Sequence, residues 1–184
     1  MRIATMTRSM TMTMSMVVAA TLGGCASYTE GMGSQATTGP IAVASLSTAS
    51  GVAAGRATAS ETTAGLRVTI EAVGSTPGSH GVHIHTTGRC DAPDFMTAGG
   101  HWNPLGTKHG SMNPAGPHEG DLPNLVIGND GRGTLAVTIP GGTLAGLLDS
   151  DGSAMVIHAG QDDLTTDPSG NSGARVACGT FVAG

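Results

Sequence analysis

The sequence contains few aromatic residues, which make up only 2% of the chain. The complete set is Trp102, Tyr28, Phe95 and Phe181. The core must therefore be built from Val, Leu, Ile and Ala, which favours strands. Segments 66–72 and 134–139 alternate apolar and polar residues with period two, and no convincing amphipathic helix occurs in the body of the chain. The 30 glycines and 9 prolines supply many tight turns.

Basic residues are also scarce. The chain has 8 Lys and Arg against 13 Asp and Glu, and its formal net charge is −5. Phosphate binding needs a basic surface, so this charge balance argues against nucleic acid as a partner.

The first 24 residues predict an export signal. Two arginines precede the uncharged stretch MTMTMSMVVAATLGGC, which is too short to span a bilayer and ends in small residues. The segment LGGC resembles the cleavage box of bacterial lipoproteins, which predicts lipidation of Cys25. The alternating methionines from Met10 to Met16 could be soft copper(I) ligands, but a signal peptide that is cut away explains them better.

The remaining chain divides into a tether and one domain. Residues 25–39 are small and polar, as in a flexible spacer, and residues 40–184 show no repeat or second linker. We expect strands at 41–47, 52–59, 66–73, 80–85, 125–127, 134–139, 155–158 and 175–182. The sequence GNDGRG, residues 128–133, supplies hairpin turn residues. Many short strands joined by turns predict an all-β antiparallel sandwich or barrel.

Histidines are absent from the tether and first strands but concentrated later. Six of the seven lie within residues 80–118. His83 and His85 share one face of a strand with Cα atoms about 6.5 Å apart, so both imidazoles could reach one metal ion. Taken alone, such a pair is equally typical of core or surface histidines. A following loop of roughly 30 residues without secondary structure is unusual unless something else holds it, as a metal would.

Two donor sets can be assembled from these residues. Three histidines and an aspartate in the loop, His101, His109, His118 and Asp121, suit tetrahedral zinc. His83, His85 and His158 with one shared histidine form an all-imidazole set, which suits copper(II).

The successive motifs HGVHIHTTGRC, GGHWNPLGTKHG, HEGDLPNL, HAGQDDL and GARVACG resemble the signatures of copper/zinc superoxide dismutases, in particular the exported bacterial branch. The resemblance covers about residues 40–184 in the family's order. It implies an eight-stranded Greek-key β-sandwich or flattened barrel with long metal-binding loops. It also implies one copper and one zinc per subunit, with superoxide as substrate and O₂ and H₂O₂ as products.

The resemblance also assigns the site residues. The implied copper ligands are His83, His85, His101 and His158. The implied zinc ligands are His101, His109, His118 and Asp121, so that His101 bridges the two metals and serves as both ligand and proton donor.

Three further residues have implied roles. Arg175 corresponds to the arginine that guides the anion, since guanidinium is always protonated. Asp162 corresponds to a carboxylate that hydrogen-bonds one copper and one zinc histidine, His83 and His109, although the adjacent Asp163 could be confused with it. His80 falls at a structural position and is expected to brace a loop rather than to bind metal.

The resemblance pairs Cys90 with Cys178 in a disulfide, which requires an oxidising compartment. The chain is thus expected to be exported, in the periplasm or otherwise outside the cytoplasm, and bound to the membrane only through a lipid on Cys25. Whether it forms a homodimer stays open.

Other classes of protein remain as alternatives. A non-catalytic copper/zinc-binding or copper-delivery module would share the ligands but would not need Arg175. A catalytically silent structural relative would usually lack some ligands, and a copper-only dismutase would lack the zinc set.

Overall fold

The computed structural model describes residues 39–184. The expected signal peptide, the expected lipidation site at Cys25 and all but the end of the expected tether lie outside these residues. The strands are β1 (Ile41–Ser47), β2 (Ala53–Thr62), β3 (Gly65–Ala72), β4 (Gly78–His80), β5 (Val82–His85), β6 (Leu125–Ile127), β7 (Gly133–Ile139), β8 (Ala154–His158), β9 (Arg175–Thr180) and β10 (Val182–Ala183).

The strands pair antiparallel in two sheets. The larger sheet has the order β5-β8-β9-β1-β2-β3-β7, with β10 also paired to β1, and β4 pairs with β6. Since β4 and β5 are separated only by Gly81, and a turn joins β6 to β7, the small sheet connects the two ends of the large one. The chain leaves β7 at one end of the large sheet and enters β8 beside β5 at the other. The all-β Greek-key fold is confirmed.

Alternation along the strands builds the core. In β3, Leu66, Val68 and Ile70 are fully buried, whereas Arg67 and Glu71 point to solvent. The neighbouring strands contribute alanines and branched aliphatic residues, and Trp102 and Phe181 are the only aromatic members of the main core cluster among the described residues. Burial of this apolar surface is the main stabilising contribution to the barrel.

Two expected strands are interrupted. The segment 80–85 divides at Gly81, whose N–H donates to Gly160 O at 2.8 Å and whose Cα faces Ser172 so closely that a Cβ would overlap that side chain. The segment 175–182 divides at Phe181, after which β10 pairs with β1 instead of β8. In both places a long-range contact overrides the local apolar pattern.

The expected hairpin at 128–133 is a turn, closed by Gly128 N–H donating to Arg132 O at 2.8 Å. Its two strands do not form a ladder, because β6 pairs with β4 and β7 pairs with β3, so the hairpin prediction was wrong in its pairing. A one-turn helix, α1 (Leu144–Leu147), was not anticipated because four residues carry no periodicity. Across residues 39–184, no helix has the length and hydropathy needed to cross a membrane.

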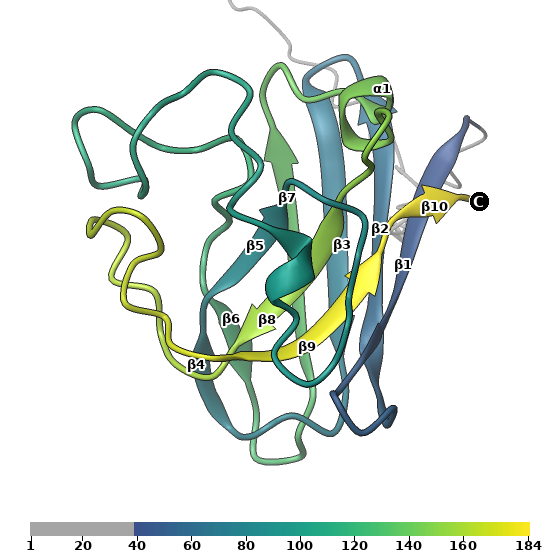
Figure 1. Ribbon diagram of the computed structural model, residues 1–184, viewed down its shortest axis with the longest axis vertical. Coiled ribbons are helices and arrows are strands. Elements are labelled where there is room, and N and C mark those ends of the chain that lie inside the picture. The colour runs from purple at the N-terminus through teal and green to yellow at the C-terminus, as the bar shows by residue number, and fades with distance from the viewer. Residues whose placement is uncertain (1–38) are drawn as a thin grey trace, which may run out of the picture. The chain divides into compact units, whose positions relative to one another are not determined.

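Two long loops project from the same side of the barrel, the teal loop between β5 and β6 and the yellow-green loop between β8 and β9 in Figure 1. The first contains a short 3₁₀ turn, η1 (Met96–Ala98). The loops contact each other through Met112 N–H donating to Leu164 O at 2.9 Å and through Lys108 Nζ donating to Asp167 at 3.0 Å. The loops therefore support each other beside the open side of β5.

Candidate metal centre

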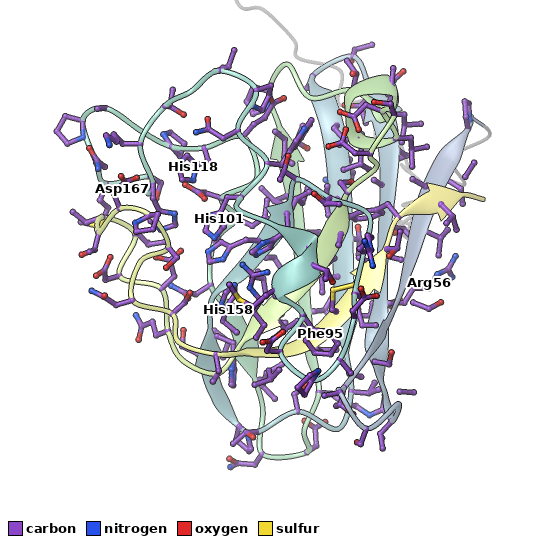
Figure 2. All side chains as sticks on the ribbon, in the orientation of Figure 1. Arg56, Phe95, His101, His118, His158 and Asp167 are labelled. Carbon is purple, nitrogen blue, oxygen red and sulfur yellow. A yellow bond between two sulfur atoms is a disulfide. The ribbon has the colours of Figure 1, made fainter. Side chains whose placement is uncertain are left out.

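Four imidazoles converge where β5 and β8 end beside the first loop. His83 and His85 occupy alternate positions of β5, and β8, which ends at His158, is its antiparallel partner. A single backbone bridge places His101 opposite His85. In Figure 2, His101 lies between His118 and His158. Donor atoms of His83, His85, His101 and His158 all lie within 4.8 Å of one another.

Hydrogen bonds fix which nitrogen of each ring is free. His85 Nδ1 lies 3.0 Å from Gly99 O, and His158 Nδ1 lies 3.1 Å from Gly173 O. A carbonyl oxygen can only accept, so each Nδ1 carries the proton and each Nε2 keeps its lone pair. Four ring nitrogens in this group are buried without a hydrogen-bond partner. They are His83 Nδ1, His85 Nε2, His101 Nε2 and His158 Nε2. Buried polar atoms are normally paired, so four converging lone pairs fit a metal with imidazole preference such as copper.

A second group surrounds Asp121. The Nδ1 atoms of His101, His109 and His118 lie 2.8, 3.0 and 3.2 Å from Asp121 Oδ1. The other carboxylate oxygen accepts from the backbone N–H groups of Gly110 and His118, which fixes its orientation. Three imidazole nitrogens and one carboxylate form a zinc donor set. His101 belongs to both groups, through Nε2 in the first and Nδ1 in the second.

Burial keeps His85, His101 and His158 neutral. It lowers the pKa of His85 to about 2 and that of His158 to about 3, and neighbouring imidazoles add to the effect. It lowers the pKa of His101 to about 4, despite the opposing hydrogen bond to Asp121. Burial alone would raise the pKa of Asp121, but hydrogen bonds from His101 and Gly110 outweigh it and hold the pKa well below its usual value. At pH 7 these three imidazoles are thus neutral and Asp121 is ionised, so all four side chains can bind a cation.

These shifts predict that the metal-free protein loses stability in mild acid. In the unfolded chain the three histidines titrate near 6.5, whereas in the folded chain they titrate between about 2 and 4. Below pH 6.5 the unfolded state therefore binds protons that the folded state does not, and the free energy of unfolding falls by up to about 4 kcal/mol per pH unit. Urea unfolding of the metal-free protein at pH 7.5, 6.5 and 5.5 measures this. A free energy that stays level over this range would contradict the prediction.

Asp162 connects the two groups. Its Oδ2 lies 2.7 Å from His83 Nε2 and its Oδ1 lies 3.0 Å from His109 Nε2. Burial favours the neutral acid, but these hydrogen bonds outweigh it and lower the pKa of Asp162. The adjacent Asp163 is exposed and accepts from the N–H groups of residues 165 and 166 in its own loop. The structure thus places Asp162, and not Asp163, between a ring of each group.

Asn124 was not anticipated from the sequence. Its Nδ2 donates to Asp162 O at 2.8 Å, and its Oδ1 accepts from Asp162 N–H at 2.8 Å. Because Asn124 directly precedes β6, this pair of bonds holds the backbone of Asp162 against the barrel. An asparagine at the end of a long loop carries no local signal for such a contact.

Arg175 begins β9 at the edge of a cavity of about 450 Å³. His85, His101 and His158 line the same cavity. The guanidinium is fixed by Nη1 donating to Phe95 O at 2.7 Å and Nη2 donating to Gly99 O at 2.6 Å. Since Gly99 O also accepts from His85, one carbonyl links the arginine to an imidazole of the first group. A positive charge therefore faces the cavity beside the unpaired nitrogens.

The disulfide between Cys90 and Cys178 joins the first loop to β9, with Cα atoms 5.7 Å apart. His80 lies outside both donor groups. Its Nδ1 contacts His158 O and its Nε2 contacts Thr76 O, both at 2.8 Å, so the ring connects β4 to the end of β8.

The class of protein is thus a Greek-key β-barrel with two adjoining groups of side chains that could each hold a metal ion, with His101 in both. The chain belongs to the copper/zinc superoxide dismutase family, whose model matches residues 51–181.

Among curated relatives, the superoxide dismutase-like protein YojM of Bacillus subtilis is 48% identical over 124 residues, 64% of this chain. The match spans 63% of that relative, slightly less than two thirds of its length. Superoxide dismutase [Cu-Zn] 1 of Aquifex aeolicus is 43% identical over 131 residues, 68% of this chain and 78% of the relative.

Two solved structures have the same fold. The superoxide dismutase-like protein from Bacillus subtilis superposes with a TM-score of 0.72 at 43% identity, covering 76% of this chain and 97% of that one. Cu/Zn superoxide dismutase from Brucella abortus gives a TM-score of 0.63 at 30% identity, covering 76% and 98%.

Proposed function

We propose that the protein is a catalytic copper/zinc superoxide dismutase, which converts two superoxide anions and two protons into O₂ and H₂O₂. The main support for this function is the set of four buried imidazole nitrogens without hydrogen-bond partners, which lie beside the three Nδ1 atoms around Asp121. Copper at the first group would supply one-electron oxidation and reduction, and zinc at the second a fixed positive charge. The ligands would be those implied by the sequence, with His101 common to both metals.

In this proposal His101 takes up a proton and donates it during the reaction. With both metals bound, His101 would be a ligand through each of its two nitrogens and would have lost its N–H proton. Its Nδ1 lies beside Asp121. Its Nε2 would take up a proton and donate it to an oxygen atom of the substrate at the buried end of the cavity. The three other imidazoles keep fixed tautomers because their second nitrogens are hydrogen-bonded to Asp162 and to two carbonyls.

Arg175 holds the substrate. Its two carbonyl contacts orient the guanidinium, and the remaining N–H groups can bind a small monoanion beside His85 and His158. The charge is positive at any working pH, so capture of superoxide does not depend on protonation of the arginine.

The test is the decay of superoxide in the presence of the full chain loaded with copper and zinc. We expect decay much faster than in buffer, and Arg175→Ala should lose about tenfold in rate at low ionic strength because the anion loses its charged partner. Arg89→Ala is the matched control, since Arg89 is an exposed arginine paired with Asp91 and does not line the cavity. If both metals bind stoichiometrically but superoxide decays no faster than in buffer, the proposal fails.

That negative outcome would favour the second candidate, a non-catalytic copper/zinc-binding or copper-delivery module. One comparison supports it, because the Bacillus relative is named dismutase-like and not dismutase. Arg175 favours catalysis instead, since a metal store needs no fixed cation inside its cavity.

We propose further that the protein acts outside the cytoplasm. Residues 1–24 would serve as an export signal, Cys25 as a lipid attachment site, residues 25–39 as a tether and residues 40–184 as the dismutase domain. The disulfide supports this location because such bonds persist in oxidising compartments.

A further inference from the structure

Met96 lies at the rim of the cavity that leads to the unpaired nitrogens. Its side chain is 62% exposed, and it lines the same cavity of about 450 Å³ as His85, His101 and His158. Among the described residues that line this cavity, its thioether is the only sulfur. The imidazoles thus form the buried end of the cavity and Met96 belongs to its exposed end.

Met96 is held in its exposed position by a hydrogen-bonded turn. Its N–H donates to Asp94 Oδ1 at 3.1 Å, and its carbonyl accepts from Gly99 N–H at 3.0 Å. The preceding Phe95 is only 3% exposed and packs in a cluster with Cys178. The buried phenylalanine fixes η1 to the disulfide, so the next side chain is presented outward beside the cavity.

Beside Met96, the carboxylate of Asp94 offsets the positive charge of Arg175. Asp94, Met96 and Arg175 line an adjoining hollow of about 310 Å³, and the Asp94 carboxylate is exposed. The chain as a whole is acidic, with a formal charge of −5. A thioether is a soft, uncharged donor that selects copper(I) over zinc, whereas imidazole accepts both.

We propose that Met96 is a capture ligand for copper(I), which it passes to the imidazole nitrogens of the first group. The transfer is a ligand exchange, in which the bond from copper to sulfur breaks as bonds to nitrogen form. Copper keeps its oxidation state, and no proton has to leave when it binds His83 Nδ1, His85 Nε2 and His158 Nε2, which already carry lone pairs. This step rests on the proposed copper site but not on dismutase activity.

The experiment follows copper(I) leaving a coloured chelator complex and entering the full-length protein loaded with zinc. Met96→Leu removes the sulfur and keeps an apolar side chain of similar size. Met112→Leu is the matched control, because Met112 is 70% exposed in the same long loop but does not line the cavity. We expect Met96→Leu to slow uptake about fivefold with an unchanged final copper content, and Met112→Leu to behave as the parent.

A second readout uses silver(I), a redox-inert substitute for copper(I). In protein with ¹³C-labelled methionine methyl groups, the signal that is lost in Met96→Leu should shift on the first additions of silver(I), before the Met112 signal. Equal uptake rates in all three proteins, or equal shifts for both methionines, would overturn the capture role. Failure of every variant to take up copper would overturn the copper site itself.

Discussion

Gly170→Ala should weaken zinc binding by roughly 10–100-fold, although Gly170 is not a ligand. Gly170 lies in the loop between β8 and β9 with a φ of +62°. A Cβ there would overlap Asp162 Oδ1 and lie 2.7 Å from His109 Nε2. The added methyl group must therefore displace the carboxylate from His109, and the hydrogen bond that orients this zinc-group histidine is lost.

Competition for zinc against a chelator, with Gly170→Ala beside the parent protein, gives the affinity. Gly173→Ala is the control, because Gly173 lies in the same loop with a φ of +78° but has no atom closer than 3.9 Å to an added Cβ. Both variants carry the strain of a left-handed alanine, roughly 1–2 kcal/mol, and only Gly170→Ala adds the overlap. Equal zinc affinities in the two variants would show that the Asp162 contact does not support the site.

Removing the disulfide should lower the free energy of unfolding by about 4–5 kcal/mol in the chain-entropy model. The bond closes a loop with a sequence separation of 88. For a domain of this size, that loss corresponds to a fall in Tm of roughly 10–20 °C. The measurement is thermal unfolding of metal-free Cys90→Ala/Cys178→Ala beside the parent protein.

The same variant should lose activity when loaded with metals. The loop held by Cys90 carries the carbonyls of Phe95 and Gly99, which fix the guanidinium of Arg175. Freed from β9, this loop no longer holds the arginine in one orientation, and the anion loses a fixed partner. A reductant should bring the parent protein to the level of the double variant and leave the variant unchanged. A double variant with parental Tm and activity would contradict both expectations.

Much of the fold was predictable because strand alternation is a local property. The period of two along β3 identifies its buried face without knowledge of any partner strand. The interruptions at Gly81 and Phe181 were not predictable, because each depends on a segment distant in the sequence. The same holds for β6, whose pairing with β4 instead of β7 is decided by closure of the barrel.

The sequence by itself determined which donor side chains are present and how they divide into two sets. Histidines two apart on a strand share a face, and a long loop rich in histidine favours a metal site. Only the tertiary structure decided the tautomers of His85 and His158, since these depend on the carbonyls of Gly99 and Gly173. It also decided the anchoring of Asp162 by Asn124, across 38 residues, and the position of Met96 at the rim of the cavity. Such contacts join segments far apart in the chain, and no local pattern encodes them.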